Sequence, residues 1–139
     1  MSKQSIRKSI DHYKGLRTKA EEELKKLEEE LELLNIFRKQ YINAQTEFGR
    51  NMNNRNKRLS QVGDISAKVK CAEKYHKGMY ETLNGNENKV ILMEIESISD
   101  NTNKEIHERE VKIEDLKRDI DRYNRTIRDL YDQLSRERD

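Results

Sequence analysis

A seven-residue repeat of mostly apolar residues runs through the first third of this chain. One line of positions steps by seven residues, and a second line stands three residues before each member of the first. The first line is Tyr13, Ala20, Leu27, Leu34, Tyr41 and Phe48, and the second is Ile10, Arg17, Leu24, Leu31, Arg38 and Gln45. This spacing is typical of a helix whose apolar seam faces another helix in a left-handed coiled coil.

The C-terminal part of the chain repeats this pattern. Its two lines are Leu92, Ser99, Ile106, Ile113, Ile120, Ile127 and Leu134, and Ile95, Thr102, Arg109, Leu116, Tyr123 and Leu130. Only 32% of the residues are apolar, 40% are charged and Pro is absent. A coiled coil tolerates such a composition because it buries about two positions in seven. Intrinsic disorder is the competing interpretation of so polar a chain, but sustained heptads disfavour it.

We therefore predict an all-α fold, a long antiparallel helical hairpin or coiled coil with a short middle helix, in a single domain over 1–139. Gly63 followed by Asp64 indicates a break, and Asn84-Gly85-Asn86 is the strongest turn signal in the chain. The predicted elements are an arm over 4–61, a middle helix over 65–83, a turn at 84–86 and a returning helix over 87–136.

Two arrangements of these helices are compatible with the pattern. In the favoured one, 4–83 is a nearly continuous arm, because the heptad lines keep their phase past Gly63. A returning helix of about 50 residues then covers about 75 Å, at ~1.5 Å per residue, and leaves the first ~30 residues overhanging. In the alternative, the chain reverses around 55–85, so that 6–52 lies against 92–134.

The overhang would expose a leucine seam, and an unpaired seam is an adhesive surface. Next to it, 31–42 is apolar on several faces, which indicates burial on more than one side. The predicted partner-binding residues are Leu24, Leu27, Leu31, Leu34, Ile36, Phe37 and Tyr41. The alternative is packing of this stretch within the hairpin. Val90, Ile91, Leu92, Met93, Ile95 and Ile98 form a similar apolar patch.

No arrangement of residues indicates catalysis. His12, His76 and His107 are scattered, and no spacing typical of a metal site or a phosphate-binding loop is present. We expect no enzyme activity, no catalytic or metal-binding residues and no cofactor. Acidic residues are interleaved with the basic ones, so nucleic-acid binding is disfavoured; the basic cluster at 50–58 is the one candidate for it.

The location of the protein is predicted from what the sequence lacks. No apolar run is long enough to span a membrane, so we expect no membrane insertion. No secretory signal peptide is visible, and Cys71 is the only cysteine. These features fit a cytoplasmic protein, or one exported without a cleavable signal peptide.

One short stretch points to a family. Tyr75-His76-Lys77-Gly78-Met79-Tyr80-Glu81-Thr82-Leu83 resembles the W-x-G stretch at the turn of helical-hairpin proteins of type VII secretion, with His76 in the Trp position and Gly78 matching. The layout is similar to small helical partner proteins encoded beside LXG toxins in Gram-positive bacteria. The resemblance makes His76 and Gly78 a turn motif. It implies a non-enzymatic adaptor or targeting chaperone that binds the helical N-terminal LXG region of a toxin.

Two other functions follow from the same pattern. A second copy of the chain would close the seam equally well, which predicts a self-assembling coiled-coil scaffold or tether. A chaperone resembling prefoldin, with two coiled-coil arms, is the third hypothesis, although 53–88 does not have the pattern of the β-hairpins that prefoldins carry.

Overall fold

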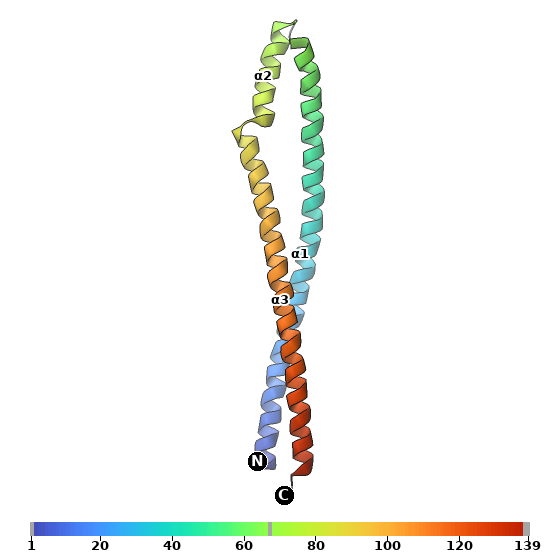
Figure 1. Cartoon of the computed structure of the whole chain (residues 1–139), viewed down its shortest axis with the longest axis vertical. Coiled ribbons are helices and arrows are strands. Elements are labelled where there is room, and N and C mark those ends of the chain that lie inside the picture. The colour runs from blue at the N-terminus through green and yellow to red at the C-terminus, as the bar shows by residue number, and fades with distance from the viewer. Residues whose placement is uncertain (1, 67, 138–139) are drawn as a thin grey trace. The chain divides into compact units, whose positions relative to one another are not determined.

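The computed structural model describes residues 2–66 and 68–137, and within these residues every regular element is an α-helix. The helices are α1 (Lys3–Ser66), α2 (Lys70–Asn84) and α3 (Asn86–Arg136), coloured from blue to red in Figure 1. The predicted all-α helical hairpin with a short middle helix is confirmed. The predicted end of the last helix at residue 136 is exact, and the other predicted starts and ends differ from the observed ones by one to five residues.

The ends of α1 follow from local chemistry. The hydroxyl of Ser2 accepts a hydrogen bond from the backbone N–H of Ser5 at 3.1 Å, which caps the first turn as expected of a serine at this position. At the other end the helix does not stop at Gly63 but continues to Ser66. One glycine inside a helix costs only about 1 kcal/mol, which packing compensates. The break indicated by Gly63 and Asp64 is therefore absent, and the helix continues through Gly63 as the unbroken heptad phase predicted.

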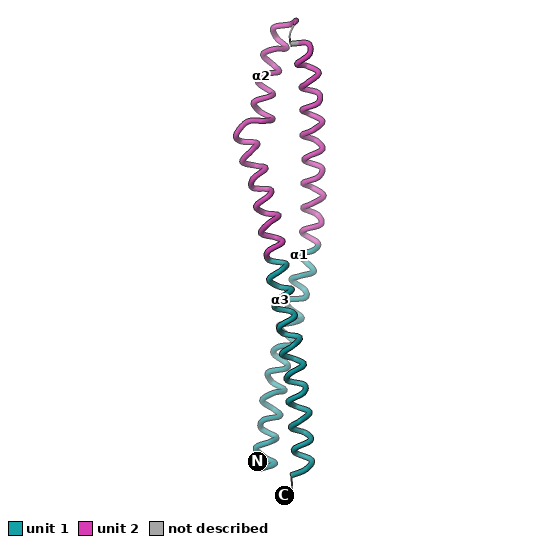
Figure 2. The backbone as a smooth tube through the Cα atoms, viewed as in Figure 1, with its two compact units in different colours: residues 1–35, 105–139 teal, residues 36–104 magenta. Residues whose placement is uncertain are grey.

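Figure 2 divides the chain into two compact units, of which unit 1 comprises residues 1–35 and 105–139. In its described part, the start of α1 pairs with the end of α3. Arg17 donates a hydrogen bond to the side chain of Asn124 at 3.0 Å, and Arg109 donates one to Glu30 at 3.1 Å. Residue numbers rise along one helix as they fall along the other, so the pair is antiparallel. Its buried apolar residues are Ile6, Ile10, Ala20, Leu27, Ile106, Ile113 and Ile127.

Unit 2 comprises residues 36–104 and contains the end of α1, all of α2 and the start of α3. The hydroxyl of Tyr41 donates a hydrogen bond to the carbonyl of Ile95 at 3.0 Å, and Asn84 donates one to the side chain of Asn56 at 3.0 Å. These bonds again pair rising with falling residue numbers. The first half of this hairpin is therefore α1, and the second half is α2 followed by α3.

The direction of α2 corrects the favoured arrangement. The chain reverses between Ser66 and Lys70, and α2 runs back along α1 (Figure 1). The prediction of a continuous arm over 4–83 with the hairpin turn at 84–86 is wrong. The structure matches the alternative, in which 6–52 lies against 92–134. The physical reason is burial: in the observed pairing α3 covers the leucine seam of α1, whereas the favoured arrangement leaves about 30 residues of that seam in water.

The strong turn signal at 84–86 instead marks a bend between α2 and α3. Gly85 has φ −79° and ψ −179°, an extended conformation between two helices. A Cβ atom at this position would lie 2.2 Å from the carbonyl oxygen of Glu81. No side chain fits so close to a backbone atom, so this bend requires glycine.

Candidate interaction surfaces

The leucine seam predicted to bind a partner lies inside the hairpin. Leu27 is only 8% exposed, and Leu24, Leu31 and Leu34 are half-buried. All four belong to unit 1, where the described part of α3 is the segment available to cover them. The overhanging seam of the favoured arrangement is therefore absent, and these four residues hold the two helices together.

Polar residues at seam positions reach polar partners on the opposite helix. Besides the bonds of Arg17 and Arg109, the guanidinium of Arg38 lies 3.5 Å from the side-chain oxygen of Asn103. The Arg109–Glu30 pair is partly shielded, with its two side chains 26% and 35% exposed. A polar seam residue lowers stability but favours the register that gives it a partner. These bonds thus favour the observed pairing of α1 with α3.

Exposed apolar side chains gather on both long helical segments of unit 2, and they lie on more than one side of the hairpin, because Val90 to Met93 are consecutive residues of α3. We use "apolar surface" for eight side chains that are between 43% and 69% exposed: Ile36, Phe37 and Ile42 on α1, and Val90, Ile91, Leu92, Met93 and Ile98 on α3. It includes two of the predicted partner-binding residues, Ile36 and Phe37. Tyr41, another predicted partner-binding residue, is half-buried. Its ring stacks on the ring of Phe37, with 5.7 Å between the ring centroids.

The seam is loose where the apolar surface lies. No residue is buried over 36–58 of α1, and none is buried over 84–101 on the opposite arm of the hairpin. Leu92 occupies a seam position and is still 46% exposed, and the seam residue Gln45 is exposed as well. Two helices alone therefore do not remove these side chains from water.

The predicted turn motif lies inside a helix. His76 and Gly78 both belong to α2, before the bend at Gly85. A Cβ atom on Gly63 would lie 2.9 Å from Nε2 of His76, so the imidazole packs closely on α1, and it also stacks on Tyr80. Gly78 has open space around it. His76 therefore serves to pack α2 on α1, and the assignment of these two residues to a turn is wrong.

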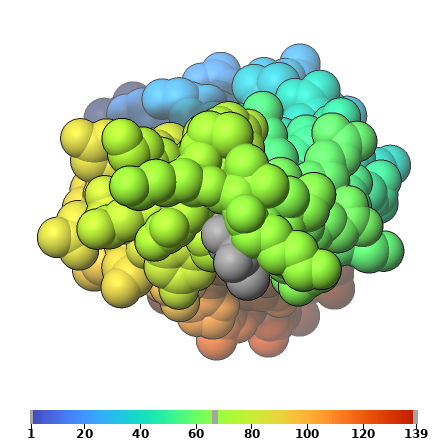
Figure 3. Space-filling model, turned by 90° about the horizontal axis from the view of Figure 1, so that it is seen from above, coloured from blue at the N-terminus to red at the C-terminus, as the bar shows by residue number. Residues whose placement is uncertain are grey.

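A groove of about 220 Å³ lies between the end of α1 and α2. We call it the tip groove; its lining residues are Arg55, Arg58, Leu59, Val62, Tyr75, Met79 and Leu83. Figure 3 views this end of unit 2, where side chains of α2 and of the neighbouring end of α1 cover the face. The basic cluster at 50–58 indicated Arg55 and Arg58 from the sequence. Tyr75 and Met79 were missed as a surface, although they stand eight and four residues before Leu83, which puts all three on one helix face.

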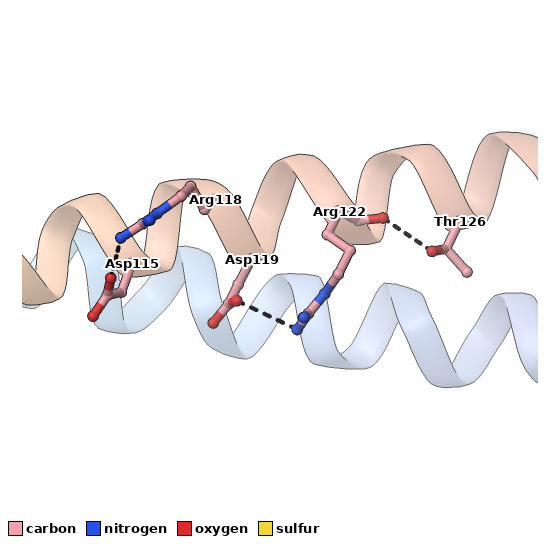
Figure 4. Close-up of polar contacts among 5 residues, drawn as sticks. All are labelled: Asp115, Arg118, Asp119, Arg122 and Thr126. Atoms are coloured by element: carbon pink, nitrogen blue, oxygen red, sulfur yellow. Dashed lines mark hydrogen bonds and ion pairs between the residues drawn. The ribbon is translucent and has the colours of Figure 1, made fainter.

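A charged strip runs along α3 in unit 1 (Figure 4). Arg118 pairs with Asp115, Arg122 pairs with Asp119 at 3.3 Å, and the hydroxyl of Thr126 donates to the carbonyl of Arg122 at 3.0 Å. Both ion pairs join residues three apart and are largely exposed to solvent. Such pairs stabilise a helix by a few tenths of a kcal/mol, about 0.2–0.5 each. The strip is a solvated helix face.

The chemistry-bearing residues are dispersed. Within 2–66 and 68–137, no group of three or more His, Cys, Asp and Glu side chains is placed to hold a metal ion. Cys71 is exposed. Among the described helices, none has a stretch both long and apolar enough to cross a membrane.

Comparison with models of protein families, with curated proteins and with solved structures finds no match for this chain. Two features therefore remain for a functional argument. One is the apolar surface on α1 and α3, and the other is the tip groove between α1 and α2.

Proposed function

We propose that this chain is a non-enzymatic helical adaptor, which binds a helical segment of another protein on the apolar surface of unit 2. The observation that carries this proposal is the set of eight exposed apolar side chains on a hairpin segment without a buried residue. The resemblance of the layout to partners of LXG toxins supports the LXG region of a type VII secreted toxin as the bound helix.

The mechanism is helix-on-helix burial. An amphipathic helix lying on α1 and α3 would remove from water those members of the apolar surface that face it, and would complete a local three-helix packing. Each large apolar side chain that becomes fully buried contributes about 1.5–3 kcal/mol, and those of the apolar surface are already about half buried. Burial of the members that face the bound helix would therefore stabilise a complex without any covalent chemistry.

The test is binding of the full chain to the LXG region of a toxin encoded by a neighbouring gene. We expect a one-to-one complex in isothermal titration calorimetry. The double variant Ile42→Glu with Met93→Glu places two charges on the apolar surface, and we expect it to weaken binding by about 100-fold. These side chains are 47% and 69% exposed, so the free chain should fold as before.

The matched control introduces the same side chain beside the apolar surface. Gln40→Glu with Asn101→Glu changes two exposed polar residues of the same helices and should leave the affinity within a few fold. Equal affinity of both double variants for the toxin region would refute the assignment of this surface. Absence of any binding by the unmodified chain would refute the proposed partner.

The scaffold hypothesis is tested on the same samples by light scattering. A single chain has a mass of 16.7 kDa, and we expect this value for the free protein. A dimer that dissociates in the Ile42→Glu, Met93→Glu variant would show that a second copy covers the apolar surface. That result would replace the adaptor by the self-assembling scaffold.

A further inference from the structure

The end of unit 2 where α1 gives way to α2 carries a local excess of positive charge. Residues 50–80 contain eight Lys and Arg against two Asp and Glu, a formal charge of +6, whereas the whole chain has +2. The remainder of the chain is therefore negative, at −4. Because the Debye length is about 8–10 Å at physiological salt, the charge of this segment acts locally rather than being cancelled by distant acids.

The tip groove lies within this basic segment and combines two chemistries. Leu59 and Leu83, each 5% exposed, form its buried apolar part, and Val62 and Met79 are half-buried. Arg55, an exposed residue, stands one helical turn before Leu59 on α1. The groove thus has an apolar interior bordered by cationic side chains.

The second arginine and the aromatic ring complete the border of the groove. Arg58 is exposed and stands one turn before Val62, and Tyr75 is 56% exposed on α2. Two arginines three residues apart lie on one face of a helix. Each guanidinium offers a planar pair of donors that matches a carboxylate.

We propose that the tip groove is a second protein-binding site, separate from the apolar surface, which takes an acidic peptide segment with a large apolar side chain next to its carboxylates. The volume sets the size of the inserted group. A cavity of about 150 Å³ holds a benzene molecule, so a groove of about 220 Å³ accepts one Leu, Met or Phe side chain. The carboxylates of flanking Asp or Glu residues bind Arg55 and Arg58.

The groove favours a peptide over the other polyanions that a basic surface attracts. A nucleic acid supplies the negative charge, but its apolar groups are flat bases and the small thymine methyl, which fill a site formed by Leu59 and Leu83 less well than a Leu, Met or Phe side chain does. A lipid bilayer presents its headgroup charges and its acyl chains at different depths. Only a peptide carries a carboxylate and a compact apolar side chain on neighbouring residues. The chain would then bridge two proteins, one on the apolar surface and one at the tip groove.

The experiment selects ligands without presupposing their sequence. A library of random 16-residue peptides is displayed and selected on the full-length chain, and the affinity of the strongest peptide is measured by fluorescence anisotropy. We expect selected peptides to share Asp or Glu within two positions of Leu, Met or Phe. We expect the Arg55→Glu, Arg58→Glu variant to bind them at least 30-fold more weakly. The Arg55→Lys, Arg58→Lys variant keeps the charge but loses the planar donor pair, so we expect an intermediate loss of several fold.

Two controls separate this site from general charge effects and from misfolding. Reversal of an exposed arginine in unit 1, Arg128→Glu, should leave peptide affinity unchanged. Circular dichroism should give the same helicity for all variants, because Arg55 and Arg58 are exposed. The reversed variant should also keep its affinity for the toxin region, so failure at the tip groove is distinguishable from failure of the proposed function.

Several outcomes would overturn the proposal. These are selection of no peptide, selection of peptides without acidic residues, and equal binding to the reversed variant. Tighter binding of a 20-residue oligothymidylate, or of vesicles containing phosphatidylserine, than of the selected peptide would assign the basic segment to nucleic acid or to lipid instead.

Discussion

Two leucines six residues apart on α1 give a direct test of the hairpin. Leu27 is 8% exposed and Leu33 is 67% exposed, although both belong to the same helix and to unit 1. Substitution by alanine removes the same three carbon atoms at each position. It also changes helix propensity by the same small amount, a few tenths of a kcal/mol in favour of alanine. The difference between the two variants therefore reports burial alone.

The expected magnitudes follow from the exposed fractions. Three methylene-sized groups contribute about 2.4 kcal/mol when fully buried, at ~0.8 kcal/mol each. The three groups of Leu27 are almost fully buried and contribute nearly all of this free energy, and their removal leaves a partly filled cavity. We therefore expect Leu27→Ala to lower the free energy of unfolding by about 2–3 kcal/mol. The three groups of Leu33 are about one third buried and contribute about a third of this free energy, so Leu33→Ala should lower the free energy of unfolding by less than about 1 kcal/mol.

The assay is urea denaturation followed by circular dichroism at 222 nm, with free energies from linear extrapolation. Since both substitutions lie in unit 1, a separate unfolding step of unit 2 would not affect their comparison. Equal losses of stability for the two variants would refute the arrangement of the seam. A cost of Leu33→Ala that grows with protein concentration would show that Leu33 is buried by a second copy.

Three further substitutions test individual features of the structure. Gly85→Ala places a Cβ atom against the carbonyl oxygen of Glu81, so we expect a loss of about 1–2 kcal/mol and faster amide exchange around the bend; increased stability would contradict this. Arg109→Ala removes a partly shielded ion pair with Glu30 and should lower the free energy of unfolding by about 0.5–1 kcal/mol, and by less in 1 M salt. A loss of stability that does not depend on salt would exclude an electrostatic origin. Thr102 is 6% exposed at a seam position, and its hydroxyl donates a hydrogen bond to the carbonyl of Ile98 in its own helix. Thr102→Val should therefore raise stability by about 0.5–1 kcal/mol in thermal melts, and a decrease would argue against a seam role.

The sequence was enough to predict the exposed apolar patches on α1 and α3. It was not enough to predict which of the apolar residues the hairpin itself would bury. Phe37 and Met93 lie off the heptad lines, and the sequence indicated that both patches exceed what one seam can bury. Their exposure on unit 2 agrees with that prediction. The burial of Leu27 does not agree with its predicted place on an unpaired seam. Whether a seam residue is free or covered depends on which distant segment lies opposite, and the heptad repeat carries no information about this.

The place of the chain reversal shows the same limit. Asn84-Gly85-Asn86 has the strongest turn composition and yet forms only a bend, whereas the reversal between Ser66 and Lys70 contains no Gly, Pro or Asn. The helix end there is closed by backbone bonds, as the N–H of Lys68 donates to the carbonyl of Ile65 at 2.9 Å. The composition of a turn shows which backbone conformations the segment tolerates. It does not show whether the chain bends slightly there or reverses its direction.

The sequence by itself determined that this chain is helical, where α3 begins to within one residue, and which side chains of unit 1 face another helix. These properties depend on neighbours within one or two helical turns, and a period of 3.5 residues records them directly. The tertiary structure alone decided which seam covers which, that Leu24, Leu27, Leu31 and Leu34 lie inside the hairpin, and that a groove forms between α1 and α2. Those properties depend on burial between segments far apart in the chain, where several pairings keep the same heptad phase and differ only in how much apolar surface they remove from water.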